Sequence, residues 1–71
     1  MPRSFRDADR SISARLRLLR REFGISQAGL GEMISVSYQQ VQKYEAGKNR
    51  MNAGLLYEIS NLLGVPDHLF F

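Results

Sequence analysis

Apolar residues recur along the first part of the chain at the spacing of an α-helix. Ile12, Leu16, Leu19 and Phe23 are separated by four, three and four positions, which places them on one helix face. Gly24 follows this stripe, and glycine is typical of the residue just after a helix end. No segment alternates apolar and polar residues with β-branched enrichment, so the pattern predicts an all-α fold without strands.

Three further helices are predicted, each preceded by a residue that can cap its first turn. Ser26 precedes a helix over residues 27–34, and Asn52 precedes a fourth helix that ends before Gly64. Ser37 precedes the third helix and forms an S-x-x-Q capping box with Gln40. The predicted inward positions of the second and third helices and their link are Leu30, Ile34, Val36, Val41 and Tyr44. The fourth helix bears Leu55, Leu56, Ile59, Leu62 and Leu63.

A fifth short helix is predicted near the end of the sequence, with Pro66 in its first turn. It ends in the apolar residues Leu69, Phe70 and Phe71. The expected fold is therefore a compact bundle of five short helices over residues 11–71. Residues 1–10 carry no apolar stripe, and we expect them to form a flexible N-terminal arm.

The composition excludes several classes of function. The 71 residues contain no cysteine, so disulfides, thiolate zinc sites and cysteine nucleophiles are absent, and the single histidine, His68, offers no metal site. A domain this small has a thin core and little room for a deep pocket, so we expect neither an enzyme nor a cofactor. No apolar run approaches the roughly 20 residues of a membrane helix. The N-terminus also lacks the apolar segment of a secretory signal, so we expect a cytoplasmic protein.

Positive charge is concentrated in the first half of the chain. Ten Lys and Arg residues oppose seven Asp and Glu residues, which gives a net charge of +3. Seven of the ten lie in the first 21 residues, and the others are Lys43, Lys48 and Arg50. A basic surface suits a nucleic acid, but a solvated helix face accounts for a run of arginines equally well. Charge alone therefore leaves both interpretations open.

The stretch from Gln27 to Tyr44 carries the strongest functional pattern. Its two helices are joined only by Ser35 and Val36, and so short a link forces them to cross steeply, as in a helix-turn-helix unit. Gly31 stands where a large side chain would push the helices apart. The outward face of the second helix reads Tyr38, Gln39, Gln42 and Lys43, all hydrogen-bond donors and none acidic. Such a face suits base edges in the major groove of DNA.

These residues resemble a known family, the phage-repressor-like helix-turn-helix proteins of the Cro/repressor (Xre) type. The resemblance extends from about Ile12 to Phe70 and is carried mainly by GISQAGLGEMISVSYQQVQKYEAGKNR and LYEISNLLGVP. It implies a lambda-repressor-like fold and a transcriptional regulator, most often a repressor. Proteins of this type bind double-stranded DNA through a recognition helix in the major groove.

The resemblance also implies roles for single residues. Ser37, Tyr38, Gln39 and Lys43 match positions that reach base edges, and Gln42 borders them. Contacts to the DNA backbone are expected from Gln27, which also braces the recognition helix, and from Lys48, Asn49, Arg50 and Asn52. Arg20 and Glu45 match a structural ion pair between the first and third helices.

Two positions depart from the family pattern. Ser35 stands where the turn usually has glycine, so this serine is expected to adopt a positive φ at some energetic cost. Gly29 stands where an acidic residue is usual, and a glycine inside a helix costs about 0.5–1 kcal/mol relative to alanine. Both departures affect the turn and the stability of its first helix, and neither changes the outward face of the third.

One recognition helix reads only a few base pairs, so the resemblance implies a homodimer on an inverted-repeat operator, with half-sites about 34 Å apart. Leu69, Phe70 and Phe71 form a candidate dimer surface, extended by Leu56 or Tyr57, because exposed adjacent phenylalanines would make an aggregation-prone patch. The alternative is that they fold back onto the first helix as core. A different class of function also stays open: an antitoxin or other interaction module that binds a toxin or another protein.

Overall fold

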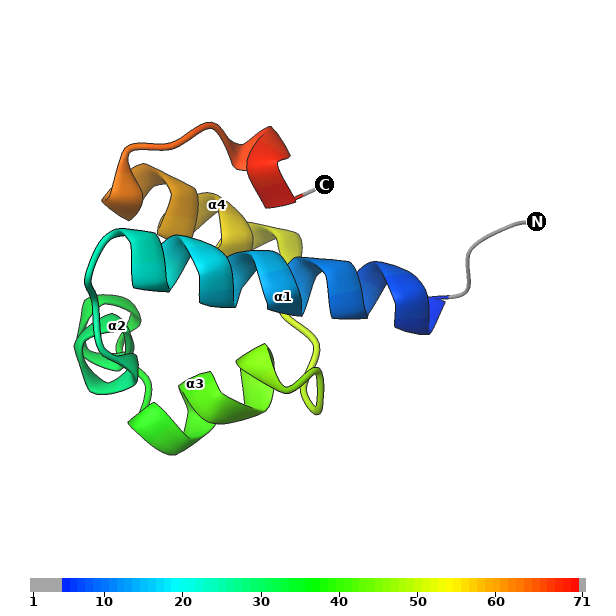
Figure 1. Cartoon of the computed structure of the whole chain (residues 1–71), viewed down its shortest axis with the longest axis horizontal. Coiled ribbons are helices and arrows are strands. Elements are labelled where there is room, and N and C mark those ends of the chain that lie inside the picture. The colour runs from blue at the N-terminus through cyan, green and yellow to red at the C-terminus, as the bar shows by residue number, and fades with distance from the viewer. Residues whose placement is uncertain (1–4, 71) are drawn as a thin grey trace.

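The computed structural model describes the backbone of residues 5–70 and the side chains of residues 10–70 other than Asp67. It contains α1 (Phe5–Glu22), α2 (Gln27–Ile34), α3 (Tyr38–Glu45), α4 (Ala53–Leu63) and a 3-10 turn, η1 (Asp67–Phe70). No strand occurs among the described residues, so the predicted all-α class is confirmed. Figure 1 shows α1 running along the length of the molecule, with α2 and α3 on one side and α4 and η1 on the other.

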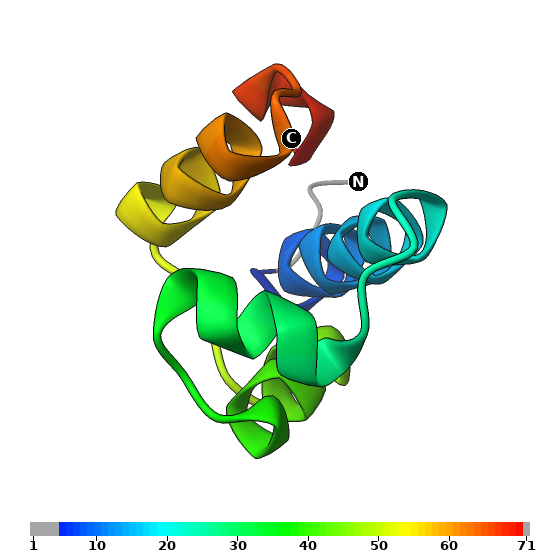
Figure 2. The ribbon, with the colours of Figure 1, turned by 90° about the vertical axis from the view of Figure 1, so that its left-hand side faces the viewer.

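The core is a single cluster to which every element contributes. Its buried members are Leu16, Leu30, Ile34, Val41, Met51, Leu56, Ile59, Leu63 and Phe70. Leu16, at the middle of α1, is fully buried, and α1 packs against α3 and η1. In the end-on view of Figure 2, α2 and α3 lie below α1, and α4 lies above it. Helix α3 therefore lies at one edge of the molecule, and no other helix of residues 5–70 covers its outer face.

Two apolar residues of the predicted helices are exposed. Phe23 is 48% exposed because α1 ends at Glu22, and the chain then turns at Gly24, where φ is 66°. The partly buried Ile25 packs against the core in its place. Leu62 on α4 is 47% exposed, beside the buried Leu63. Helical spacing identifies the apolar positions of a helix, but it does not show which of them the neighbouring helices cover.

The predicted flexible arm over residues 1–10 is wrong for residues 5–10, which form the first turns of α1. The apolar stripe marks where a helix packs against the core, and a helix can continue beyond that region. Residues 5–10 contain no glycine or proline to stop it, and they include two aspartates, which are favourable near a helix N-terminus. Residues 1–4 lie outside the described residues.

The predicted fifth helix is a 3-10 turn, so residues 5–70 form four α-helices and one short turn. Its Leu69 N–H donates to the Pro66 carbonyl at 3.2 Å, the i→i+3 bond of a single tight turn. Phe70 is only 1% exposed and belongs to the core, which removes it from the predicted dimer surface. Burial of its ring against α1 and α4 is the physical reason, since η1 packs on both helices. Leu69 is partly buried, and Phe71 lies outside the described residues.

Candidate nucleic-acid interface

The junction between α2 and α3 is a tight turn that fixes how the two helices cross. Ser35 adopts the left-handed conformation, with φ 62° and ψ 42°, as predicted from its place in the turn. The Val36 N–H donates to the Gly31 carbonyl at 2.9 Å. A Cβ atom at Gly31 would lie 2.6 Å from the Val36 carbonyl oxygen, closer than van der Waals contact allows. Gly31 is therefore the close-contact position, and its lack of a side chain lets α3 pack tightly.

The same packing determines which face of α3 is exposed. Val41 is fully buried and Tyr44 is half-buried against the core, so the opposite face points outward. That face carries the four predicted residues, all of them exposed: Tyr38, Gln39, Gln42 and Lys43. Tyr38 is 49% exposed despite its large ring. The predicted surface of hydrogen-bond donors is therefore accessible to a ligand.

Three helices begin with side-chain caps, and their first turns contain no acidic residue. Ser26 Oγ accepts from the Gly29 N–H at 2.9 Å, and Ser37 Oγ accepts from the Gln40 N–H at 3.1 Å. Asn52 Oδ1 accepts from the Leu55 N–H at 2.8 Å. Ser37 retains its hydroxyl hydrogen and Asn52 its amide group as donors. Helix N-termini carry partial positive charge, so these ends favour an anion such as phosphate.

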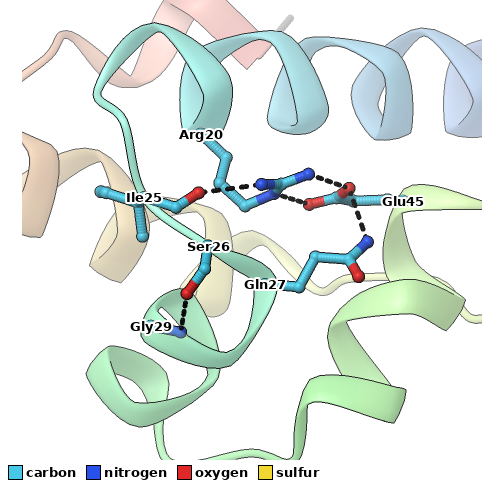
Figure 3. Close-up of polar contacts among 6 residues, drawn as sticks. All are labelled: Arg20, Ile25, Ser26, Gln27, Gly29 and Glu45. Atoms are coloured by element: carbon cyan, nitrogen blue, oxygen red, sulfur yellow. Dashed lines mark hydrogen bonds and ion pairs between the residues drawn. The ribbon is translucent and has the colours of Figure 1, made fainter.

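The predicted ion pair between Arg20 and Glu45 is present and joins α1 to the end of α3 (Figure 3). Arg20 Nε donates to Glu45 Oε2 at 2.6 Å, and Nη2 donates to Oε1 at 3.1 Å. The remaining guanidinium nitrogen, Nη1, donates to the Ile25 carbonyl at 2.8 Å. The hydrogen bond and charge of Glu45 raise the pKa of Arg20 above its ordinary value, so the arginine stays protonated. The pair is nearly buried, with side-chain exposures of 11% and 4%.

Gln27 completes this network from the first residue of α2. Its Nε2 donates to Glu45 Oε1 at 3.2 Å, so it braces the C-terminal end of α3, as the resemblance implied. Its Oε1 is left to accept other bonds. The side chain is half-buried, and its expected contact with a DNA phosphate stays a prediction.

The loop from α3 to α4 presents three exposed polar residues, Lys48, Asn49 and Arg50. Its backbone returns to α3, since the Lys48 N–H donates to the Lys43 carbonyl at 2.9 Å. Met51 anchors the other end of the loop in the core, at 8% exposure. Sequence reasoning missed Met51, and the only signal was a single apolar residue among polar ones. The loop therefore holds its polar tip beside the exposed face of α3.

Among the described residues, no cluster of histidine and carboxylate side chains could hold a metal ion. None of the described helices is long and apolar enough to cross a membrane. The residues predicted to contact DNA lie on α3, in the following loop and at the N-termini of α2, α3 and α4. We refer to this set below as the α3 surface. Its central helix, α3, lies on the side of the molecule away from η1 and most of α4 (Figure 1).

Comparison with known proteins identifies the family of this chain. The helix-turn-helix family model HTH_3 matches residues 16–70, which is most of the chain. The chain belongs to this family. HTH_3 proteins are DNA-binding transcriptional regulators of the Cro/repressor (Xre) type, as the sequence motifs had indicated.

The relatives are bacterial proteins named as transcriptional regulators. One from Sinorhizobium medicae (strain WSM419) is 46% identical over 63 residues, which cover 89% of this chain and 45% of the relative. Another, y4aM of Sinorhizobium fredii (strain NBRC 101917 / NGR234), is 52% identical over 60 residues, covering 84% and 42%. A regulator in the ATPase CF(0) region of Rhodospirillum rubrum is 41% identical over 69 residues, covering 97% and 64%. This HTH_3 chain thus spans about half the length of the first two relatives.

Solved structures share the fold at low sequence identity. The clp gene regulator ClgR from C. glutamicum superposes with a TM-score of 0.81 at 24% identity, over 89% of this chain and 82% of that one. The restriction-modification controller protein C.AhdI from Aeromonas hydrophila gives a TM-score of 0.80 at 23% identity, over 92% and 97%. These likenesses establish the arrangement of the helices in this HTH_3 domain.

Proposed function

We propose that this domain binds double-stranded DNA sequence-specifically, by placing α3 in the major groove, and that it serves a transcriptional regulator, in the first instance a repressor. The observation that carries the proposal is the exposed, acid-free row of donors on α3, on a helix fixed by the buried Val41 and the close contact at Gly31. Glutamine and lysine side chains on such a helix match the acceptors and donors of purine edges.

Each part of the α3 surface has a proposed task. Base edges are contacted by Ser37, Tyr38, Gln39, Gln42 and Lys43, all of which are exposed. The DNA backbone is contacted by Gln27, Lys48, Asn49, Arg50 and Asn52, which lie at helix N-termini or in the loop after α3. Backbone contacts fix the position of a protein on the duplex, and base contacts supply its sequence preference. The proposed backbone contacts come before and after α3 in the chain, and the proposed base contacts lie on α3 and its N-cap, which supports these separate roles.

We further propose that the protein acts as a homodimer in the cytoplasm, on an operator with two inverted half-sites. A single recognition helix covers too few base pairs for tight binding, and two half-sites about 34 Å apart place both helices on one face of DNA. Of the candidate dimer residues, Leu69 is partly buried, and Tyr57 on α4 is 58% exposed. Both lie away from the α3 surface, so pairing through them leaves α3 free for DNA.

The test is selection of bound duplexes from a randomised pool at about physiological salt, where non-specific phosphate contacts are weakened. An inverted repeat with half-sites about 10 base pairs apart is the expected product. Folded protein that enriches no motif would refute the proposal and direct the search to a toxin or other protein partner.

Two variants on the selected operator then separate the proposed tasks. Lys43→Ala is expected to cost about 1–3 kcal/mol and to relax the preference at one base pair, because a base contact is lost. Arg50→Ala is expected to weaken binding to all sequences about equally and to reduce the slope of log affinity against log salt by about one. If Lys43→Ala weakened every sequence equally, Lys43 would be a phosphate contact instead.

A further inference from the structure

A groove of about 460 Å³ lies between α1 and the C-terminal end of α3, and none of the residues predicted to contact DNA lines it. Three arginines of α1 line one wall: Arg10, Arg17 and Arg21. Ala46 and Gly47, which follow α3, line the other together with Glu45, whose charge is already paired with Arg20. Figure 1 shows α1 passing above α3.

The three arginines form a row on one side of α1. They are separated by seven and four positions, the spacing of residues that share a helix face, and at about 1.5 Å per residue they span about 16 Å. All three are exposed. Within the part of the chain that the structure describes, the side chains of these three arginines make no hydrogen bond or ion pair. The row is therefore a line of positive charges available to an anionic ligand.

Other arginines of the same helix are engaged in the fold. Arg20 pairs with Glu45, and Arg15 Nη1 donates to the Leu69 carbonyl at 2.9 Å. Of the five arginines on α1 whose side chains the structure describes, two thus have internal partners and three line the groove. The clustering of three positive charges along one groove favours an anionic ligand over a merely solvated face.

The opposite wall of the groove is continuous with the base-contacting face of α3. Ala46 follows Gln42 by four positions and Gln39 by seven, so all three lie on one side of the helix axis. DNA bound to that face would border the groove directly. A protein segment seated in the groove would overlap the same DNA, so a nucleic acid is the better occupant.

We propose that this groove holds the sugar–phosphate backbone flanking the bases read by α3, with Arg10, Arg17 and Arg21 binding consecutive or nearby phosphates. The proposal rests on the proposed DNA-binding function and extends it, because it adds α1 to the DNA interface. Guanidinium groups bind phosphate oxygens through charge-assisted and often paired hydrogen bonds. The small side chains of Ala46 and Gly47 leave room for the backbone to enter.

The experiment compares Arg17→Gln with the matched control Arg15→Gln, since each removes one positive charge from α1 and only the first removes it from the groove. Affinity for the selected operator is measured over a range of salt concentrations. Each lost phosphate contact lowers the slope of log affinity against log salt by about 0.9. We expect this reduction for Arg17→Gln and an unchanged slope for Arg15→Gln. Thermal unfolding of both variants verifies that they are folded.

A second series shortens the operator duplex from its outer ends. The difference between wild type and Arg17→Gln should disappear once the flanking phosphates are removed, while the effect of Lys43→Ala should remain. Equal slopes for Arg17→Gln and Arg15→Gln on the full-length duplex would overturn the inference. So would an Arg17 effect that is independent of duplex length.

The two proposals fail in distinguishable ways. Loss of the α1 contact leaves sequence-specific binding through α3 intact, with a motif still recovered by selection. Failure of the proposed function removes the motif, and the two arginine variants can then still be compared on a random duplex. A competing acidic protein that displaced DNA from wild type but not from Arg17→Gln, without an Arg17 effect on DNA itself, would also overturn the assignment to DNA.

Discussion

Replacing Arg20 by methionine tests whether the network around Glu45 holds α1 against α3. Methionine keeps an unbranched, apolar chain but removes the guanidinium group. Glu45 then loses two of its three hydrogen bonds and retains only Gln27 Nε2 at 3.2 Å. The Ile25 carbonyl loses its partner as well. A carboxylate with 4% side-chain exposure is left in the fold without its counter-charge.

The expected cost follows from this burial. An exposed ion pair contributes about 0–1 kcal/mol, whereas removing one partner of a buried pair costs about 3–5 kcal/mol. Because both side chains are at most 11% exposed, the larger range applies. A chain of 71 residues is expected to have a stability of about 4–11 kcal/mol. Arg20→Met should therefore remove a large part of the stability and lower Tm by about 12 °C or more.

Urea denaturation followed by far-UV circular dichroism measures this loss. A double-mutant cycle with Glu45→Met isolates the pair, since the double variant leaves no unpaired charge and should be more stable than Arg20→Met alone. A loss below about 1 kcal/mol for Arg20→Met would refute the reasoning, because it would mean that water screens the pair. A folded Arg20→Met protein with normal stability but no DNA binding would instead make Arg20 a DNA contact.

Two substitutions near the α2–α3 turn give further checks by urea denaturation. Gly31→Ala should cost about 1–3 kcal/mol, because its Cβ would meet backbone 2.6 Å away. Gly29→Ala should cost less than Gly31→Ala, since its Cβ would meet only side-chain atoms, Ser26 Oγ at 3.1 Å and Ile25 Cγ2 at 3.3 Å, and alanine is the better helix former. Equal losses at both positions would contradict the packing argument. Ser35→Gly should raise stability by about 1 kcal/mol by relieving a φ of 62°, and a decrease would show that the serine side chain stabilises the turn.

Much of the candidate site could be predicted from local sequence signals. The caps Ser26, Ser37 and Asn52 begin their helices as predicted, because capping depends on residues only three positions apart. Helical spacing also identified the exposed donors on α3. The resemblance supplied the contact between Arg20 and Glu45, two residues 25 positions apart.

Other features depended on how distant segments meet. The sequence did not distinguish whether Phe70 belongs to a dimer surface or to the core. In the structure η1 packs on α1 and α4, and this packing buries Phe70. Met51 became a core residue because the loop after α3 returns across the molecule. The start of α1 was missed because residues 5–10 precede the apolar stripe by which the sequence marks this helix.

The sequence by itself determined the helical class, the caps, the helix-turn-helix unit and the outward residues of α3. These features follow from periodicity and from hydrogen bonds between near neighbours in the chain, which the amino-acid order specifies directly. Only the tertiary structure decided that Arg15 has an internal partner and that Arg10, Arg17 and Arg21 line the groove beside α3. That distinction depends on what each helix face meets in space, because the Leu69 carbonyl that Arg15 binds lies 54 positions away in the chain.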